Sequence, residues 1–439
     1  MLGIRPEQAP KPAESWIGPA PWFETAIPGP IAKQVIDADQ AVSSPSYTRD
    51  YPLVVKRALG SVVEDVDGNR FLDLCAGIAV CATGHCHPKV VEAIKLQAEN
   101  LVHICGADFY YPSMAQAMEQ IAAIVPGSKP KRVFLTNSGA ETVEAAIKLA
   151  RFTTGRKYLL AFHGAFHGRT MGALSLSNSK WRHREGFGPF VPMVEHVPYQ
   201  DIDAIENTLF KHKMNPHEVA GIFVEAIQGE GGYVVSDADF LPRLRALCDK
   251  HGILLICDEI QSGMGRTGKW FAFEHYGIQP DMVMMAKGIA SGMPLGALVT
   301  ADDLMEWPPG AHASTFGGNP VSCAAAVATI ELVQAGLMDN AEKLGADLLN
   351  TLRELSESAK ILHNPRGLGF MCAVDVVSPR TNSPDPARRN RVAREAFDRG
   401  IIVLPCGESG IRFCPPLCIN KTQLEVGLKL FAEAVQTVG

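Results

Sequence analysis

The sequence predicts an α/β protein: a large domain built on a mainly parallel sheet, followed by a smaller α+β domain. Between residues 71 and 325, short apolar runs alternate with helical patterns, as in 132–136 followed by 141–152 and 221–226 followed by 238–251. This alternation is typical of parallel strands whose connecting helices cover both faces of a sheet. From residue 326 to 439, helical stretches mix with strand-like runs, which predicts the smaller domain.

Residues 1–70 are predicted to form a proline-rich arm and a segment that joins the smaller domain. Seven prolines fall in the first thirty residues, with Trp16, Trp22 and Phe23 among them. Proline prevents a long regular helix. The aromatic residues suggest an arm that packs on another surface, and a disordered tail is the alternative. The first residues do not show the pattern of a secretory signal peptide, which is a charged segment, then an apolar stretch, then a cleavage site. We therefore expect a cytoplasmic protein.

Composition narrows the class of partner. The chain has 439 residues, of which 46% are hydrophobic and 20% charged, and its formal net charge is −6. A chain without a basic surplus is a poor ligand for phosphate backbones, so we expect no nucleic-acid partner. The strongest membrane candidate, 282–299, contains a lysine, a proline and three glycines, which argues against a spanning helix. We therefore expect small-molecule substrates and no membrane.

The first candidate site is the stretch 137–141, between a predicted strand and a predicted helix. Ser138, Gly139 and Ala140 lie at the start of a helix whose apolar positions recur with helical spacing. Free backbone N–H groups at a helix start attract anions, so this stretch is a candidate phosphate site. A serine that caps the helix requires much the same residues, and that alternative stays open.

The second candidate is the end of the apolar run 253–257. Asp258 follows this run directly, at the sheet edge where open α/β sheets bind ligands. A buried carboxylate is costly without a partner, so a cationic partner is expected, although a simple loop cap is an alternative. The glycines at 263, 265 and 268 spell GxGxxG, but no helical pattern follows them, so NAD binding is not predicted.

Lys287 is the third candidate, because it interrupts an apolar run. Residues 283–286 before it are apolar, and Gly288, Gly292 and Gly296 follow it. A lysine in a dry, tightly turned site can form an imine with a carbonyl compound. The cysteines and histidines of 75–105 lack the paired spacing of zinc ligands, so no metal site is predicted.

The three candidates together provide what pyridoxal phosphate requires. The lysine supplies an imine, the helix start holds a phosphate, and the strand-end aspartate keeps the pyridine nitrogen protonated. Each residue type falls where an α/β sheet brings strand ends together. We therefore predict pyridoxal 5'-phosphate as the cofactor.

From about residue 51 to the C-terminus, the chain resembles the class III aminotransferases, the 4-aminobutyrate and ornithine type, of fold type I. The matching blocks are DVDGNRFLDLCAGIAVCATGHCHP, TNSGAETVEAAIKLAR, AFHGAFHGRT, VEAIQGEGG, CDEIQSGMGRTG, AKGIASGMPLGA, STFGGNP and IRFCPPL. The resemblance implies that Lys287 is the Schiff-base lysine and the base that moves the substrate proton. It implies further cofactor contacts, with Ser138, Gly139, Ala140, Phe166, His167, Asp258 and Gln261 on the same subunit and Thr315 reaching over from the second subunit of a homodimer or a dimer of dimers.

The resemblance also implies a substrate site. An arginine matching Arg412 receives an α-carboxylate, and a glutamate matching Glu230 pairs with that arginine when no α-carboxylate is present. Arg169 matches a position that contacts the distal carboxylate in the 4-aminobutyrate branch. The sequence departs from the family pattern at two places near the substrate pocket. Ala226 stands where most relatives have proline, and residues 81, 86 and 105, in the loop that borders the pocket, are cysteines.

The predicted reaction is transfer of an amino group from an ω-amine, 4-aminobutyrate or a similar donor, to 2-oxoglutarate. An ornithine or acetylornithine donor is one alternative. A racemase or epimerase on the same scaffold is another, because both reactions pass through a carbanion and differ in where the proton returns. In the racemase branch an aspartate occupies the place of Glu230, so the glutamate favours transamination.

Overall fold

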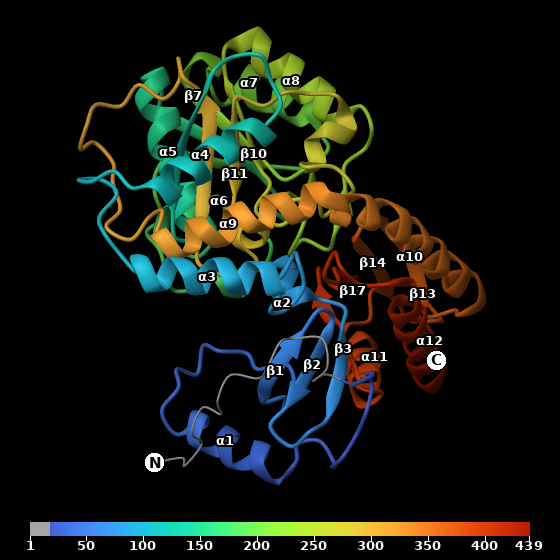
Figure 1. Ribbon diagram of the computed structural model, residues 1–439. Coiled ribbons are helices and arrows are strands. Elements are labelled where there is room, and N and C mark those ends of the chain that lie inside the picture. Colours follow the sequence, from blue (N-terminus) through green and yellow to red (C-terminus); the bar gives the residue numbers. More distant parts are fainter. Residues whose placement is uncertain (1–17) are drawn as a thin grey trace.

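The computed structural model describes residues 18–439. Figure 1 shows a large body around a central sheet and, beside it, two smaller sheets to which both ends of the chain contribute. The predicted α/β class with a mainly parallel central sheet is confirmed.

The central sheet has seven strands in the order β4-β12-β11-β10-β7-β5-β6. Its strands are β4 (Lys131–Thr136), β5 (Tyr158–Phe162), β6 (Val194–Val197), β7 (Val219–Val224), β10 (Leu254–Asp258), β11 (Met282–Met285) and β12 (Gly296–Ala301). All neighbours pair in parallel except β12, which is antiparallel to both β11 and β4. Asp258 lies opposite Met284, so β10 and β11 end almost level.

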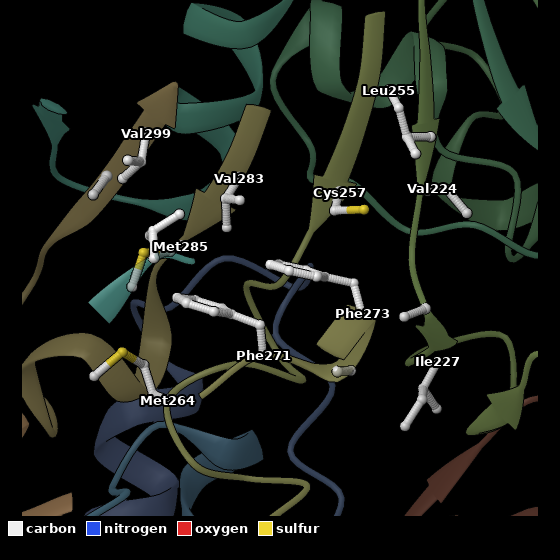
Figure 2. Close-up of a cluster of buried hydrophobic side chains, with 14 of the residues drawn as sticks. Val224, Ile227, Leu255, Cys257, Met264, Phe271, Phe273, Val283, Met285 and Val299 are labelled. Carbon is white, nitrogen blue, oxygen red and sulfur yellow. The ribbon is translucent and has the colours of Figure 1, made fainter. Parts of the chain in front are cut away.

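The apolar runs of the central strands are continuous because both faces of the sheet are buried. Leu255, Cys257, Val283 and Met285 point to one face, where Phe271 and Phe273 cover them, as Figure 2 shows. The alternate residues point to the other face and pack on α5. The helices of this domain are α3 (Pro88–Asn100), α4 (Pro112–Ile124), α5 (Gly139–Thr154), α6 (Met171–Leu176), α8 (Phe240–His251) and α9 (Pro320–Leu332).

The smaller sheets lie at the two ends of the chain. One has the order β1-β2-β3-β15, with β1 (Val55–Leu59), β2 (Val62–Asp65), β3 (Arg70–Asp73) and β15 (Ile401–Ile402). The other has the order β13-β14-β17-β16, with β13 (Leu362–Leu368), β14 (Met371–Val376), β16 (Leu404–Cys406) and β17 (Gly410–Phe413). Because β3 pairs in parallel with β15, the N-terminal segment is joined to the C-terminal part of the chain. The exact boundaries at 71 and 326 stay a prediction.

Three long helices cover these smaller sheets: α10 (Met338–Ser358), α11 (Pro386–Asp398) and α12 (Lys421–Val438). The remaining elements are short or peripheral: α1 (Pro30–Gln40), α2 (Ala76–Ala79), α7 (Phe210–His212), β8 (Ile227–Gln228), β9 (Val234–Val235), η1 (Trp181–His183), η2 (Ala204–Leu209), η3 (Pro216–Glu218), η4 (Ala272–Tyr276), η5 (Lys287–Ala290) and η6 (Val333–Leu337).

The described part of the N-terminal arm packs on β3. Trp22 and Arg70 exchange two backbone hydrogen bonds of 3.0 and 2.7 Å, and Phe23 meets Phe71 edge to face. For residues 18–30, this packing supports the interpretation of an arm that packs on another surface over that of a disordered tail. Trp16 and the earlier prolines lie outside the described residues.

One helical stretch, Pro320–Ser358, is long and apolar enough by composition to cross a membrane. It comprises α9, η6 and α10, and Figure 1 shows it running from the large body to the smaller sheets. Half of its apolar window is buried, and α9 packs against α3 and α4. A core helix of this kind passes the same compositional test, so the stretch is weak evidence for a membrane segment.

Candidate active site

A cavity of about 390 Å3 opens at the C-terminal ends of β10 and β11, beside the start of α5. Nine of the predicted site residues line it: Ser138, Gly139, Ala140, Phe166, His167, Arg169, Asp258, Gln261 and Lys287. A larger cavity of about 630 Å3 lies at the opposite ends of the strands and contains none of them. We therefore assign the chemistry to the smaller cavity, at the sheet edge where α/β proteins bind ligands.

Lys287 enters the cavity through an unusual backbone conformation. It is the second residue after β11, and its φ of 48° lies in the left-handed region, which is uncommon for residues other than glycine. Such local strain clusters at functional sites, where the surrounding structure maintains it. Burial lowers the pKa of the Lys287 amine, although the nearby Glu230 and Asp258 carboxylates oppose this effect. A lowered pKa favours the neutral amine, the form that acts as nucleophile or base.

Asp258 forms a buried pair with His167. Asp258 Oδ2 lies 2.7 Å from His167 Nδ1, and Asp258 Oδ1 accepts a hydrogen bond from the Ile260 amide at 3.0 Å. Burial alone would lower the pKa of His167, but the hydrogen bond to Asp258 raises it overall. His167 is thus a buried hydrogen-bond partner of Asp258, and it fixes the direction of this carboxylate.

The start of α5 lines the cavity at the position where the sequence predicts an anion site. Ser138 is the N-cap residue, and its Oγ accepts a hydrogen bond from the Glu141 amide at 3.3 Å. The first amides of a helix have no acceptor within it, so those of Gly139 and Ala140 are available to a ligand. A Cβ added to Gly139 would come within 2.9 Å of Ile260 Cδ1, so glycine allows the close approach of this turn to the end of β10. The cap and the anion site are therefore compatible.

Glu225 is a fourth strand-end residue in the cavity, and the sequence analysis did not identify it. It follows β7, and its two oxygens accept hydrogen bonds from the amides of Phe166 and Gly229 at 3.1 and 3.0 Å. Burial, together with the neighbouring Asp258, raises its pKa to about 7 although His167 opposes this. The strand-end argument that identified Asp258 applies equally to Glu225 and would have found it.

Glu230 and Arg412 form an ion pair beside this cavity. Arg412 lies on β17 of a smaller sheet, and its Nη1 donates to Glu230 Oε1 at 2.5 Å. Burial opposes ionisation of Glu230, but Arg412 holds its pKa at about 2. Both residues act electrostatically on Lys287: Glu230 raises the pKa of its amine and Arg412 lowers it. The two residues that the resemblance associates are thus in direct contact.

Arg169 and Thr315 occupy different positions relative to the cavity. The Arg169 guanidinium lies 5.4 Å from the centre of the Phe166 ring and lines the cavity. Thr315 is not among the lining residues, and its neighbour Ser314 accepts a hydrogen bond from Asn137 at 3.1 Å. A role for Thr315 within this subunit's own site is therefore not supported by its position.

The polar groups that line the cavity match those of pyridoxal phosphate. Among residues 18–439, buried Gln261 Oε1 has no hydrogen-bond partner, although Gln261 lines a polar cavity. Unpaired buried polar atoms are rare in folded proteins and often mark a missing partner. With the helix-start amides for a phosphate, Asp258 for a ring nitrogen and Lys287 for a carbonyl carbon, the donor set matches the attachments of this cofactor.

Fold and site together define a pyridoxal-phosphate enzyme of fold type I. The model of one family, Aminotransferase class-III, matches residues 43–435. The chain belongs to this family, and its members depend on pyridoxal phosphate.

Named relatives cover nearly the whole chain. Acetylornithine aminotransferase of Methanopyrus kandleri is 44% identical over 90% of this chain and 97% of its own length. Alanine/serine racemase of Pyrococcus horikoshii is 36% identical over 93% and 91%, and 4-aminobutyrate aminotransferase of Mycobacterium bovis is 39% identical over 92% and 96%. Among solved structures, ornithine aminotransferase of Toxoplasma gondii matches with a TM-score of 0.85 and 33% identity, covering 93% of this chain and 95% of that one.

Proposed function

We propose that this aminotransferase takes the amino group from an ω-amine of the 4-aminobutyrate type and gives it to 2-oxoglutarate. The observation that carries the proposal is the closed ion pair between Glu230 and Arg412. While the pair is closed, Arg412 offers no free charge to an α-carboxylate, which suits a donor that has none. When Glu230 moves away, the arginine can receive the α-carboxylate of the 2-oxo acid as a bidentate partner. The 4-aminobutyrate aminotransferases among its relatives support this assignment.

Each residue of the site has a task in this proposal. When bound, pyridoxal phosphate supplies a sink for the electrons left on the substrate carbon once its proton is removed. The Lys287 amine, whose pKa burial lowers, takes that proton and returns it. Asp258, held by His167, pairs with the pyridine nitrogen. Phe166 would cover one face of the ring and exclude water there, and Arg169 would hold the donor's distal carboxylate.

We also propose a homodimer in which the neighbouring subunit supplies Thr315 to the phosphate. Thr315 does not line its own cavity, and the next residue, Phe316, is 60% exposed. Val102 is also exposed, its carbonyl accepts a hydrogen bond from Asn319, and the adjacent His103 packs on Phe316, so Val102 and Phe316 present apolar surface close together. Exposed apolar groups of this size favour burial in an interface. A cytoplasmic location is consistent with eleven cysteines that are all free thiols.

A half-reaction tests the donor. The protein is saturated with pyridoxal phosphate, the excess is removed, and 4-aminobutyrate is added without an acceptor while the visible band of the cofactor is followed. Loss of the band, with release of succinate semialdehyde, supports the proposal. A band that persists excludes 4-aminobutyrate as donor.

Two lysine variants control the half-reaction. Lys287→Ala should show no turnover, whereas Lys269→Ala, which removes an exposed lysine from a turn after β10, should react like the wild type. Equal rates for Lys287→Ala and wild type would contradict the role given to Lys287.

The second candidate is an amino-acid racemase, which the 36% identical alanine/serine racemase supports. Racemisation requires no 2-oxo acid, and the proton must return to the opposite face of the substrate carbon. Incubation of the holoenzyme with L-alanine or L-serine alone, followed by chiral chromatography, separates the two candidates. Accumulation of the D-enantiomer without an acceptor would favour the racemase.

A further inference from the structure

Glu230 has a second cationic partner, Lys180, which neither the sequence nor the resemblance identified. Lys180 Nζ lies 3.5 Å from Glu230 Oε2, while Arg412 Nη1 holds the other oxygen at 2.5 Å. Within residues 18–439, Glu230 is the only hydrogen-bond partner of Lys180 Nζ. The carboxylate of Glu230 is therefore shared between two cations, each of which contacts a different oxygen.

The two cations differ in their exposure to solvent. The Arg412 side chain is 5% exposed, that of Glu230 16% and that of Lys180 25%. Arg412 thus forms the dry side of the pair and Lys180 the wetter side. Lys180 immediately precedes η1, whose His183 packs on the Phe166 ring with 5.7 Å between ring centres. The segment that carries Lys180 therefore packs against Phe166, a residue of the cavity wall.

Exchange of substrates requires Glu230 to leave Arg412, and this step has a cost. A carboxylate in a largely buried position is destabilised when it loses its partner, because protein replaces the water that would solvate it. Lys180 leaves Glu230 with a cationic partner at Oε2 when Arg412 is released. At 3.5 Å its contact in the closed state is loose, so the contact can tighten once Arg412 is released.

We propose that Lys180 is a positioning residue that holds Glu230 in the open state, while Arg412 binds the α-carboxylate of the acceptor. This inference rests on the exchange of Arg412 between Glu230 and a carboxylate in the proposed function. Lys180 shifts the balance between closed and open states, and a shift of this kind changes the affinity only for ligands that need the open state. It therefore favours 2-oxoglutarate and leaves an ω-amine donor unaffected.

The test compares the two half-reactions in Lys180→Met. The KM for 2-oxoglutarate, measured with the pyridoxamine form, should rise about fivefold, the size expected for loss of one partly exposed ion pair. The kcat of this half-reaction and the KM for 4-aminobutyrate should stay within twofold of wild type. Lys180→Arg should restore the KM, and Arg182→Met, which removes a neighbouring exposed cation, should not change it.

A double-mutant cycle with Glu230→Gln separates positioning from direct binding of substrate. If Lys180 acts through Glu230, adding Lys180→Met to Glu230→Gln should have no further effect on 2-oxoglutarate. A further rise in KM in that background would show that Lys180 contacts the substrate itself and would overturn the proposal. An unchanged KM in the single variant, or equal losses for both substrates, would overturn it too.

Calorimetry makes the test independent of the amine donor. The pyridoxal form has no amino group to give, so 2-oxoglutarate binds to it without reacting, and its Kd should rise about fivefold in Lys180→Met. If wild type fails to react with 4-aminobutyrate, the proposed donor is wrong, yet the Kd and the cycle still decide the role of Lys180.

Discussion

Replacing Arg412 by methionine should separate the two substrates of the enzyme. In the closed state Glu230 accepts one hydrogen bond from Arg412, at Nη1. When the α-carboxylate of 2-oxoglutarate takes the place of Glu230 as a bidentate partner, it accepts from Nη1 and Nη2 together. The hydrogen bond at Nη1 is exchanged with little change in free energy, and that at Nη2 is a net gain of one charged hydrogen bond, about 1.5–3 kcal/mol.

That gain sets the size of the expected effect. Since about 1.4 kcal/mol corresponds to a factor of ten, the KM for 2-oxoglutarate should rise roughly 10- to 100-fold in Arg412→Met. The half-reaction with 4-aminobutyrate, which uses the closed state, should change much less. To avoid leaving Glu230 without its main partner, Arg412→Met is best combined with Glu230→Gln and compared with Glu230→Gln alone.

Single-turnover absorbance of the cofactor measures both half-reactions in the same preparation. Circular dichroism and the stoichiometry of bound pyridoxal phosphate show whether each variant is folded and loaded. If the double variant loses both half-reactions to the same degree, or retains the wild-type KM for 2-oxoglutarate, Arg412 does not bind the α-carboxylate and the reasoning fails.

Three further changes probe the cofactor site and the core. Gly139→Ala places a Cβ 2.9 Å from Ile260 Cδ1, so the affinity for pyridoxal phosphate, measured by equilibrium dialysis, should fall. Adding Ile260→Ala should restore part of that affinity. An unchanged Kd in Gly139→Ala would contradict the packing argument. Burial raises the pKa of Glu225 from 4.5 to about 7, so the folded state holds this proton more tightly than the unfolded chain does. The free energy of unfolding should therefore fall as the pH rises from about 4.5 to 7. In Glu225→Gln, denaturant unfolding of the apoprotein across that range should lose this part of the slope, and an identical slope would refute the assignment. Gly345→Ala sets a Cβ 2.3 Å from the Gly369 backbone and should lower the free energy of unfolding by about 1–3 kcal/mol, whereas an unchanged denaturation midpoint would show that α10 can shift away.

The residues predicted most directly from the sequence are those at strand ends. Asp258 and Lys287 each follow an apolar run, and a parallel sheet brings such ends to one edge whatever their separation along the chain. Both line the cavity. The helix-start site of Ser138 was likewise visible as a local pattern, because a cap and its helix are contiguous in sequence.

The residues that pair across long separations could not be found in this way. Glu230 and Arg412 are 182 residues apart, the first in the turn after β8 and the second on β17, so only the resemblance brought them together. Lys180 lies in a charged segment without apolar periodicity, and its contact with Glu230 depends on how that segment folds over Phe166. The pairing of β3 with β15 depends in the same way on contacts that no local pattern contains.

The division of the site between two sheets has a consequence for how substrates are selected. Lys287 follows β11 of the central sheet, whereas Arg412 is built into β17 of a smaller one, and the helical stretch Pro320–Ser358 runs between their bodies (Figure 1). In the proposed function, the α-carboxylate of the acceptor is thus held by one body, while its reacting carbon faces the lysine of the other. Near the middle of the stretch, Gly336 adopts a φ of 133°, a bend that substitutions can alter far from the cavity. Substitutions at this bend are therefore expected to change the alignment of the acceptor without touching either residue.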